Sequence, residues 1–485
     1  MAQNEGTYIL GNSHTMSDFS DTSSVSDTRG LMEEKDDGKP RSSIPMTSFN
    51  FINSIIGSGI IGMPFALRQA GFGLGLILII LVAFVTDYSI LVLIETGRLS
   101  NTDTYQDMVL VAFGRPGFYV LTVLQFLYPF IAMISYNVVI GDTITKFIAW
   151  LGGENPTLVH SVLGNRQFII TVITLLVTLP LSLYKNIVML GKWAFLSILL
   201  ILFIMVAVIV RLSTFIGTIP PTEDAWQFAN YNVSQAVGIM AFAYMCHHNT
   251  FLIHSSLENP TKKRWGFVTH FSVLFAMVML LILGITGYAS FTGLTEGDLL
   301  ENYCRDDILM NISRIFFAIT IMLTYPVECF VTREVVETAI FPSNPEPPMW
   351  RHVTVTVVIV TLVGAVSMAT DCLGTVLELN GVLAAAPLAF IIPGACVMRL
   401  RQDAIFSKRN IPAMLLMAFG IIIAVCGFVM AVINMAEGIS CGHGKEPKYC
   451  MINNVTDLHI TTMSYVPVEI EPEETGLRSL IKKFV

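Results

Sequence analysis

Charged residues are scarce in this sequence. Of its 485 residues, 13% are Asp, Glu, Lys or Arg, whereas 53% are hydrophobic. A soluble domain usually carries about 25% charged residues, so this chain has too few charges to cover the surface of a soluble protein. Its net charge of −8 also argues against nucleic acid as a partner, because phosphate binding needs basic patches. The composition predicts an integral membrane protein whose main surroundings are the lipid bilayer.

The sequence also lacks the motifs that mark the common enzymes and pumps. It has no GxxxxGK[ST] phosphate-binding loop, which argues against ATP-driven transport, and it has neither HExxH nor GxSxG. It has neither an arginine-rich voltage-sensing span nor a TVGYG-type filter, which argues against a voltage-gated or potassium channel. We therefore expect neither an enzyme nor a bound cofactor.

The first 45 residues contain no long apolar run, so a cleavable signal peptide is not expected. Residues 13–28 are rich in Ser, Thr and Asp, a composition that does not bury a core. We predict a disordered tail over residues 1–45, followed by a first span that acts as an uncleaved signal.

Long apolar stretches fill most of the remaining chain. Residues 76–81, for example, form a continuous apolar run rather than the alternation of a barrel strand. The spans are therefore predicted to be helices, which satisfy their own backbone hydrogen bonds in lipid, and residues 46–436 form an all-α membrane core. Eleven segments approach the roughly 20 residues that a span needs: 47–69, 73–96, 118–149, 167–183, 193–212, 235–257, 266–291, 311–340, 352–369, 374–398 and 411–436.

The basic residues of the short loops predict the orientation of these spans. They concentrate on the side that would be cytoplasmic if the N-terminus were cytoplasmic, as Lys262, Lys263 and Arg264 illustrate. Eleven spans are an odd number, so residues 437–485 are predicted to form a tail outside the cytoplasm, in the extracellular or luminal space.

Four cysteines fall on the predicted outer side, Cys304, Cys372, Cys441 and Cys450. This is an even number in a compartment that permits disulfides. Cys441 and Cys450 are near enough in sequence to close a small loop, and Cys304 would then remain for Cys372. Spacing alone does not fix the pairing.

Three glycosylation sequons also map to the outer side or close to it, at Asn232, Asn311 and Asn454. Asn454 in the tail is the best candidate acceptor and Asn232 is the second. Asn311 lies too close to the predicted bilayer edge.

The first span is unusually rich in residues that interrupt a helix. Asn53, Gly57, Ser58 and Gly59 lie near its middle, and Pro64 follows. Glycine destabilises a helix interior by about 1 kcal/mol and allows a ligand to approach the backbone. A small-residue packing face would explain the glycines but not the buried amides. We therefore predict that the helix is unwound here.

The sixth span carries a second polar interruption, formed by His247, His248, Asn249 and Thr250. Polar groups at this depth tend to face a cavity. Adjacent histidines point apart on a helix, so a metal site is not favoured. The alternative is that the two histidines begin the cytoplasmic end of the span and are hydrated.

Interruptions five spans apart favour two inverted repeats of five helices, with a binding site between them. Repeat one would cover residues 47–212 and repeat two residues 235–398, with 411–436 as an extra span. Freed carbonyls at such breaks bind cations, and half-helix N-termini bind carboxylates.

Other polar side chains lie in the later spans. Thr320 and Thr324 are one helical turn apart in the eighth span and are suited to bind an alkali cation, unless they bond back to their own helix. Asp87, Asp142 and Glu328 are expected to be structural hydrogen-bonding groups. Glu378 in the tenth span is our candidate for a proton relay.

Two motifs resemble a known family. Residues 53–62, read N-S-I-I-G-S-G-I-I-G, resemble the first-span motif of the sodium-coupled neutral amino acid transporters, within the amino acid/auxin permease superfamily. Residues 242–247 are similar to the sixth-span motif of that family, and residues 124–137 and 377–383 extend the likeness, which covers about residues 45–435. His248 and Asn249 stand where most members have Pro and Glu.

This resemblance implies a LeuT-type fold and transport of small neutral amino acids coupled to sodium, with proton antiport in some members. By position, sodium would bind Asn53, the carbonyl of Ile56, Thr324 and, less directly, Thr320. The substrate would lie against the remaining matched residues, which are Ile56, Gly57, Ser58, Gly59, Phe242, Ala243, Cys246 and His247.

Three functions remain open at this stage. The first is a sodium-coupled amino acid transporter that works by alternating access, in the plasma membrane or in the lysosomal membrane. The second is a proton-driven carrier with Glu378 or a histidine as the relay. The third is a receptor that binds an amino acid without transporting it. The sequence does not name protein partners.

Overall fold

The computed structural model describes residues 42–152, 164–184, 194–215, 219–341, 348–370, 372–401, 403–404, 406–436 and 447–450. Across these residues the backbone is helical, and its only pairing of extended chain is an isolated bridge between Ser42 and Leu257. The prediction of an all-α protein is confirmed. Both predicted tails lie almost wholly outside the described residues, and so does Asn454.

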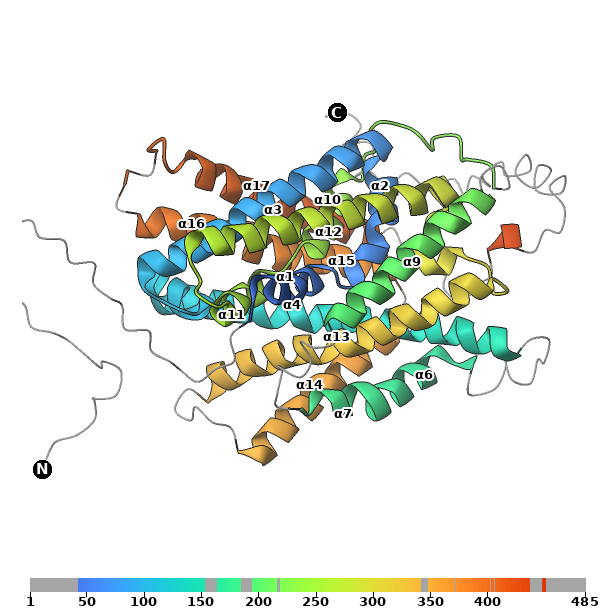
Figure 1. Cartoon of the computed structure of the whole chain (residues 1–485), viewed down its shortest axis with the longest axis horizontal. Coiled ribbons are helices and arrows are strands. Elements are labelled where there is room, and N and C mark those ends of the chain that lie inside the picture. The colour runs from blue at the N-terminus through green and yellow to red at the C-terminus, as the bar shows by residue number, and fades with distance from the viewer. Residues whose placement is uncertain are drawn as a thin grey trace, which may run out of the picture. The chain divides into compact units, whose positions relative to one another are not determined.

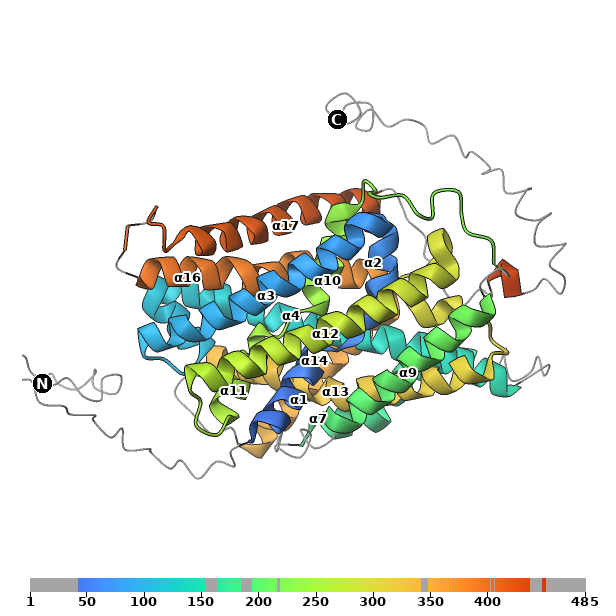
Figure 2. The same cartoon turned by 45° about the horizontal axis from the view of Figure 1, so that its top comes forward.

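The long helices α3, α9, α12 and α13 run alongside one another (Figures 1 and 2), with α12 against both α3 and α9. In chain order the principal helices are α1 (Ile44–Ile55), η1 (Ser58–Gly62), α2 (Met63–Ala70), α3 (Phe72–Ser100), α4 (Tyr105–Gly152), α6 (Arg166–Ile173), η3 (Thr174–Thr178), α7 (Leu179–Ser182), α9 (Ala194–Phe215), α10 (Val233–Ala243), α11 (His247–Ser256), α12 (Lys262–Phe291), α13 (Ile308–Ile340), α14 (Met349–Ala369), α15 (Leu373–Asn380), η6 (Gly381–Ala385), η7 (Pro387–Ile391), α16 (Ile392–Leu400) and α17 (Ile411–Ala436). Short turns η4 (Thr292–Leu294), η5 (Leu299–Asn302) and η8 (Lys448–Cys450) complete the described chain.

Nine helices in the described ranges are long and apolar enough to cross a membrane, and the bent pair 44–55 and 58–70 makes ten. The remaining predicted span, the fourth along the chain, is also helical, over Arg166–Ser182, but it is shorter than the others. Its middle turn, η3, is wider than an α-helical turn because it is π-helical. The structure therefore supports about ten spans directly, and the full count of eleven remains a prediction.

Two predicted spans are less regular than expected. α4 starts well before residue 118 and bends at Gly114, whose φ of 66° is a left-handed value that favours glycine. The span predicted over 374–398 is continuous, but η6 and η7 interrupt its α-helical geometry with π-helical turns. Pro387 lacks the N–H that would continue the α-helical hydrogen bonds, and this accounts for a local change of geometry there.

The burial of each helix separates the centre of the protein from its lipid-facing rim. In the span Val233–Ser256, which contains α10 and α11, 89% of the most apolar window is buried, whereas the figure for α17 is 28%. Large apolar side chains such as Phe84 and Leu415 point outward on the rim, as lipid contact requires. The second broken span is therefore surrounded by the other helices.

The loop between α12 and α13 is fastened to several helices at the predicted outer side. Arg68 of α2 donates a hydrogen bond to the carbonyl of Thr295 at 2.8 Å, and Lys146 of α4 lies 3.0 Å from Glu301. Arg314 of α13 is fully buried and donates to the Leu300 carbonyl at 2.9 Å. Burial, and then the neighbouring Glu301 carboxylate, raise the pKa of Asp298 in the same loop.

The disulfide pairing differs from the pairs that the spacing of the cysteines in the sequence suggested. Cys304 in this loop is bonded to Cys450, which follows α17. Cys372 is also disulfide-bonded, and Cys441 lies outside the described residues. The pairs Cys441–Cys450 and Cys304–Cys372 are therefore wrong. The reason is that Tyr449 folds onto the loop, where its hydroxyl donates to the Asn302 carbonyl at 2.6 Å and places Cys450 beside Cys304.

Asn232 is a poorer glycosylation acceptor than its sequon suggests. It is buried at the start of α10, and its amide donates to the Gln69 side chain at 2.9 Å. A glycan on this nitrogen would require the contact to open.

Candidate substrate and ion site

The first span is broken where its glycines predict. α1 ends at Ile55, the backbone turns at Ile56 and Gly57, and the helix resumes at Ser58 with its axis bent by 49°. The space at Gly57 is tight, because a β-carbon there would lie 3.1 Å from the Tyr136 hydroxyl. The predicted interruption of this helix is confirmed.

The second interrupted span breaks at the same depth and faces the first break. α10 ends at Ala243 and α11 begins at His247. A β-carbon on Gly59 would lie 2.7 Å from the Ala243 Cα and 3.1 Å from the Phe242 ring. The two breaks therefore approach closely through their backbones, at a point where Gly59 could not carry a side chain without a shift of its neighbours.

A wall of polar and aromatic side chains from α4 closes one side of the two breaks. The hydroxyls of Ser58 and Ser135 lie 2.8 Å apart and both side chains are buried. The Tyr128 ring lies 5.8 Å from the Phe242 ring and 4.8 Å from the His248 ring, between centroids. Our sequence reasoning did not assign these α4 residues to the site. The signal that could have found them is the run of polar side chains inside an otherwise apolar span.

The predicted sodium ligands lie on two elements. The Asn53 side-chain oxygen is buried near the end of α1, and no hydrogen-bond partner for it exists among the described residues. On α13, Thr324 donates to the Thr320 carbonyl at 2.9 Å and Thr320 donates to the Phe316 carbonyl at 3.0 Å. This is the back-bonding that we considered as the alternative, and it leaves the hydroxyl oxygens free to accept or to bind a cation.

No hydrogen bond within the described ranges joins Asn53 to Thr324. Their grouping around one ion therefore stays a prediction.

The two histidines of α11 point in different directions. His247 places its Nε2 3.1 Å from the Ser89 hydroxyl of α3, with its ring near Phe390 of η7. His248 points instead toward α4 and α13, where its Nε2 lies 3.4 Å from Glu328. Both side chains are buried, so the alternative of hydrated histidines at a span end is wrong. Of the two, His248 faces the α4 wall.

Glu378, our candidate proton relay, lies apart from the break in the sixth span. It is fully buried, and it accepts a hydrogen bond at 2.8 Å from Gln235 in the first turn of α10. Gln235 precedes the end of α10 at Ala243 by eight residues, or about 12 Å along a helix. The structure therefore places Glu378 between α10 and α15, and away from Cys246 and His248.

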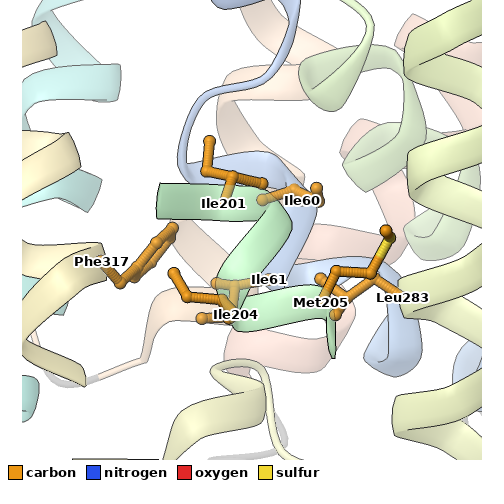
Figure 3. A pocket seen from close by; sticks show the side chains of 7 residues that line it. All are labelled: Ile60, Ile61, Ile201, Ile204, Met205, Leu283 and Phe317. Atoms are coloured by element: carbon orange, nitrogen blue, oxygen red, sulfur yellow. The ribbon is translucent and has the colours of Figure 1, made fainter. Parts of the chain in front are cut away.

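A small apolar pocket lies on another side of the first break. Figure 3 shows the side chains of η1, α9, α12 and α13 around it. A zwitterionic amino acid needs polar partners for both its charged groups, and these side chains offer none. We therefore do not place the substrate there. The lining residues are Ile60, Ile61, Ile201, Ile204, Met205, Leu283 and Phe317.

The sequence profile of the family described as "Transmembrane amino acid transporter protein" matches residues 40–440, which is most of the chain. The chain belongs to the transmembrane amino acid transporter family. It is 46% identical over 427 residues to the zebrafish (Danio rerio) protein named "Putative sodium-coupled neutral amino acid transporter 11", covering 88% of this chain and 94% of that one. The resemblance stated from the motifs is thereby confirmed, and the chain is a transporter homologue rather than an enzyme.

Two further comparisons extend the family and the fold. The "Vacuolar amino acid transporter 2" of Saccharomyces cerevisiae is 28% identical over 420 residues, which cover 83% of this chain and 86% of that one. Among solved structures, MhsT in complex with L-phenylalanine superposes with a TM-score of 0.58 at 13% identity, covering 81% of this chain and all of that one. That likeness shows the fold alone, and it supports the LeuT-type architecture expected of this family.

Proposed function

We propose that this family member is a secondary transporter that couples the uptake of small neutral amino acids to sodium by alternating access. One observation carries the proposal, namely the contact of Gly59 with Ala243, which brings two buried helix breaks together at mid-span. Backbone groups released at such breaks are suited to both parts of the cargo. The N-terminal end of the second half of the first span, at η1, favours a carboxylate, and the C-terminal end of α1 favours a cation.

In this proposal the substrate carboxylate lies against the backbone of Gly57, Ser58 and Gly59. Its side chain faces Phe242, Ala243 and Cys246. Sodium binds Asn53, the Ile56 carbonyl and the threonines of α13. The name of the zebrafish relative, which specifies sodium and neutral amino acids, supports this cargo.

We further propose that the chain crosses the membrane eleven times, as two inverted repeats of five spans and one extra span, with the N-terminus in the cytoplasm. The disulfide between Cys304 and Cys450 supports an outer position for the end of α17, because both cysteines must lie on the same side and in an oxidising compartment. The plasma membrane is the proposed location. The name of the yeast relative keeps the membrane of an acidic organelle as the alternative.

Uptake by purified protein in proteoliposomes tests the proposal. A panel of radiolabelled amino acids is offered with a sodium gradient or with choline in place of sodium. Accumulation of a neutral amino acid that requires sodium is the expected result. Uptake that follows a pH gradient and ignores sodium would identify a proton-driven carrier, and binding without flux would identify a receptor.

A further inference from the structure

A carboxylate and an imidazole meet on the rim of the protein, between the neighbouring helices α3 and α12 (Figure 2). The Nδ1 of His270 in α12 lies 2.9 Å from both carboxylate oxygens of Asp87 in α3. The side chain of His270 is 61% exposed and that of Asp87 is 19% exposed. Polar groups in a span ordinarily face the interior of the bundle or a water-filled cavity. A polar pair on the outer surface of two spans therefore indicates a partner that comes from the membrane.

The residues around the pair show that this surface faces acyl chains rather than water. Phe84 lies one helical turn before Asp87 on α3, and it is 67% exposed. On α12, His270 belongs to a stripe of exposed apolar residues that recur at helical spacing. The other members of the stripe are Phe267, Phe271, Leu274 and Val278.

The depth of the pair in the bilayer follows from the basic start of α12. This helix begins at Lys262, which is exposed together with Lys263, and such side chains extend to the membrane surface. His270 follows Lys262 by eight residues, or about 12 Å along the helix, and its side chain leans back toward the start of the helix. The interfacial layer of a bilayer is about 5–8 Å thick on each side. The imidazole therefore lies near the inner edge of this layer, below the lipid phosphates.

The free nitrogen of His270 is best matched by a hydroxyl group. A carboxylate only accepts hydrogen bonds, so Nδ1 donates to Asp87, and Nε2 of the neutral ring is an acceptor. In a protonated ring Nε2 is a donor instead. A hydroxyl serves both states, whereas the ester carbonyl of a phospholipid serves only the second. Within the described residues, Nε2 of His270 has no hydrogen-bond partner.

The apolar residues deeper in the membrane favour a flat, rigid body over another helix. Two membrane helices pack closely through small residues such as Gly, Ala and Ser. The exposed residues on the deeper side of the pair are instead large, at Phe84, Leu274 and Val278. Such side chains offer a broad apolar surface, which a system of fused rings can cover.

We propose that α3 and α12 form a binding site for a sterol. Its 3-hydroxyl bonds to Nε2 of His270, whose ring is oriented by the hydrogen bond from Nδ1 to Asp87. Its rings lie against Phe84 and Leu274. The site depends neither on the cargo nor on the coupling ion of the proposed function, so transport and sterol binding are tested separately.

Photoaffinity labelling of the purified full-length chain in phosphatidylcholine vesicles tests the proposal. The probe is a 3β-hydroxysterol with a photoreactive diazirine on ring B, and unlabelled cholesterol is the competitor. Labelled peptides are identified by mass spectrometry. We expect saturable labelling of α3 and α12, which excess cholesterol removes although phosphatidylcholine surrounds the protein.

The test variant replaces the pair by apolar residues, Asp87→Leu together with His270→Phe, so that neither partner stays unpaired in lipid. Its half-saturating probe concentration should rise about two- to tenfold, which corresponds to the loss of one hydrogen bond. Phe84→Ala should weaken labelling too, and it provides the second test if the double variant does not elute as folded protein. The matched control is Phe428→Ala, at an exposed phenylalanine of α17, which should be labelled as the wild type is.

The absence of saturable labelling of α3 and α12 in the wild type would overturn the proposal. So would unchanged labelling of the folded double variant, or of Phe84→Ala if the double variant does not fold. Disulfide cross-linking of two copies through Phe84→Cys, without any sterol labelling, would assign this face to a contact between copies of the chain and would also overturn the sterol site.

Discussion

The backbone of Gly59 lies against that of Ala243, so the breaks of two spans that are far apart in sequence form one surface. A β-carbon at Gly59 would lie 2.7 Å from the Ala243 Cα and 2.8 Å from its Cβ. Backbone atoms cannot rotate away as a long side chain can. Any residue larger than glycine must therefore push the two half-helices apart.

The first prediction concerns this contact. Gly59→Ala should lower the free energy of unfolding by about 1–3 kcal/mol, as overpacking does in a tight core, and should abolish substrate uptake. Thermal unfolding in detergent and uptake in proteoliposomes measure the two effects. Gly266→Ala in α12 is the control, because no atom lies within 4 Å of its added carbon. If both variants behave like the wild type, the breaks do not touch.

The second prediction concerns the buried oxygen of Asn53. Asn53→Ala should raise the sodium concentration for half-maximal uptake by about 10- to 100-fold, because a bond to a charged group contributes about 1.5–3 kcal/mol. Asn50→Ala removes the same amide from the same helix and should leave sodium activation unchanged. An unaltered sodium dependence in Asn53→Ala, at normal protein level, would remove Asn53 from the ion site.

The third prediction concerns the bond between the outer loop and the segment after α17. Cys304→Ser and Cys450→Ser should each lower the free energy of unfolding by about 2–4 kcal/mol, and the double variant should lose no more than either single one. Cys426→Ser, at an exposed free cysteine, serves as the control. Thermal unfolding with and without reductant provides the measurement, and additive losses would show that the two cysteines act independently.

The fourth prediction concerns the pH dependence of stability. Because burial holds the pKa of Asp298 above its ordinary value, the native state keeps a proton that the unfolded chain loses near pH 4. Stability should therefore fall as the pH rises above about 4. Asp298→Asn retains the oxygen that accepts from the Leu300 N–H and should flatten this fall.

Asp306→Asn is the matched control for that experiment, since its side chain is 88% exposed in the same loop. Its unfolding profile against pH should follow the wild type. An Asp298→Asn profile that also follows the wild type would show that Asp298 is ionised in the folded protein at neutral pH.

The sequence predicted the helices and both breaks because each depends on local properties. A run of apolar residues determines a span, and Gly57-Ser58-Gly59 weakens a helix wherever it occurs. The polar run at His247 to Thr250 pointed to the sixth span, although these residues are helical in α11 and the break lies just before them, after Ala243. The positions of these features follow from composition alone, without knowledge of the neighbouring helices.

The site contacts could not be predicted in this way. The meeting of Glu328 with His248, and the position of the α4 tyrosines, depend on how each helix is rotated about its axis. The spacing of apolar residues was a weak guide to these rotations. A buried helix such as α10 is apolar on nearly every face, so its sequence does not show which face meets which neighbour. The sequence also did not show that the side chain of Glu378 meets Gln235 of α10.

Sequence alone thus determined a helical membrane protein of the amino acid transporter family, with spans one and six broken at mid-depth. The tertiary structure decided which side chains share a site and that Cys304 pairs with Cys450. It also decided that His247 faces Ser89 of α3, whereas His248 faces Glu328 of α13. The physical reason is that helix formation is a local balance of hydrogen bonds and solvation. Contacts between distant helices instead depend on the packing of the whole bundle, which no single segment encodes.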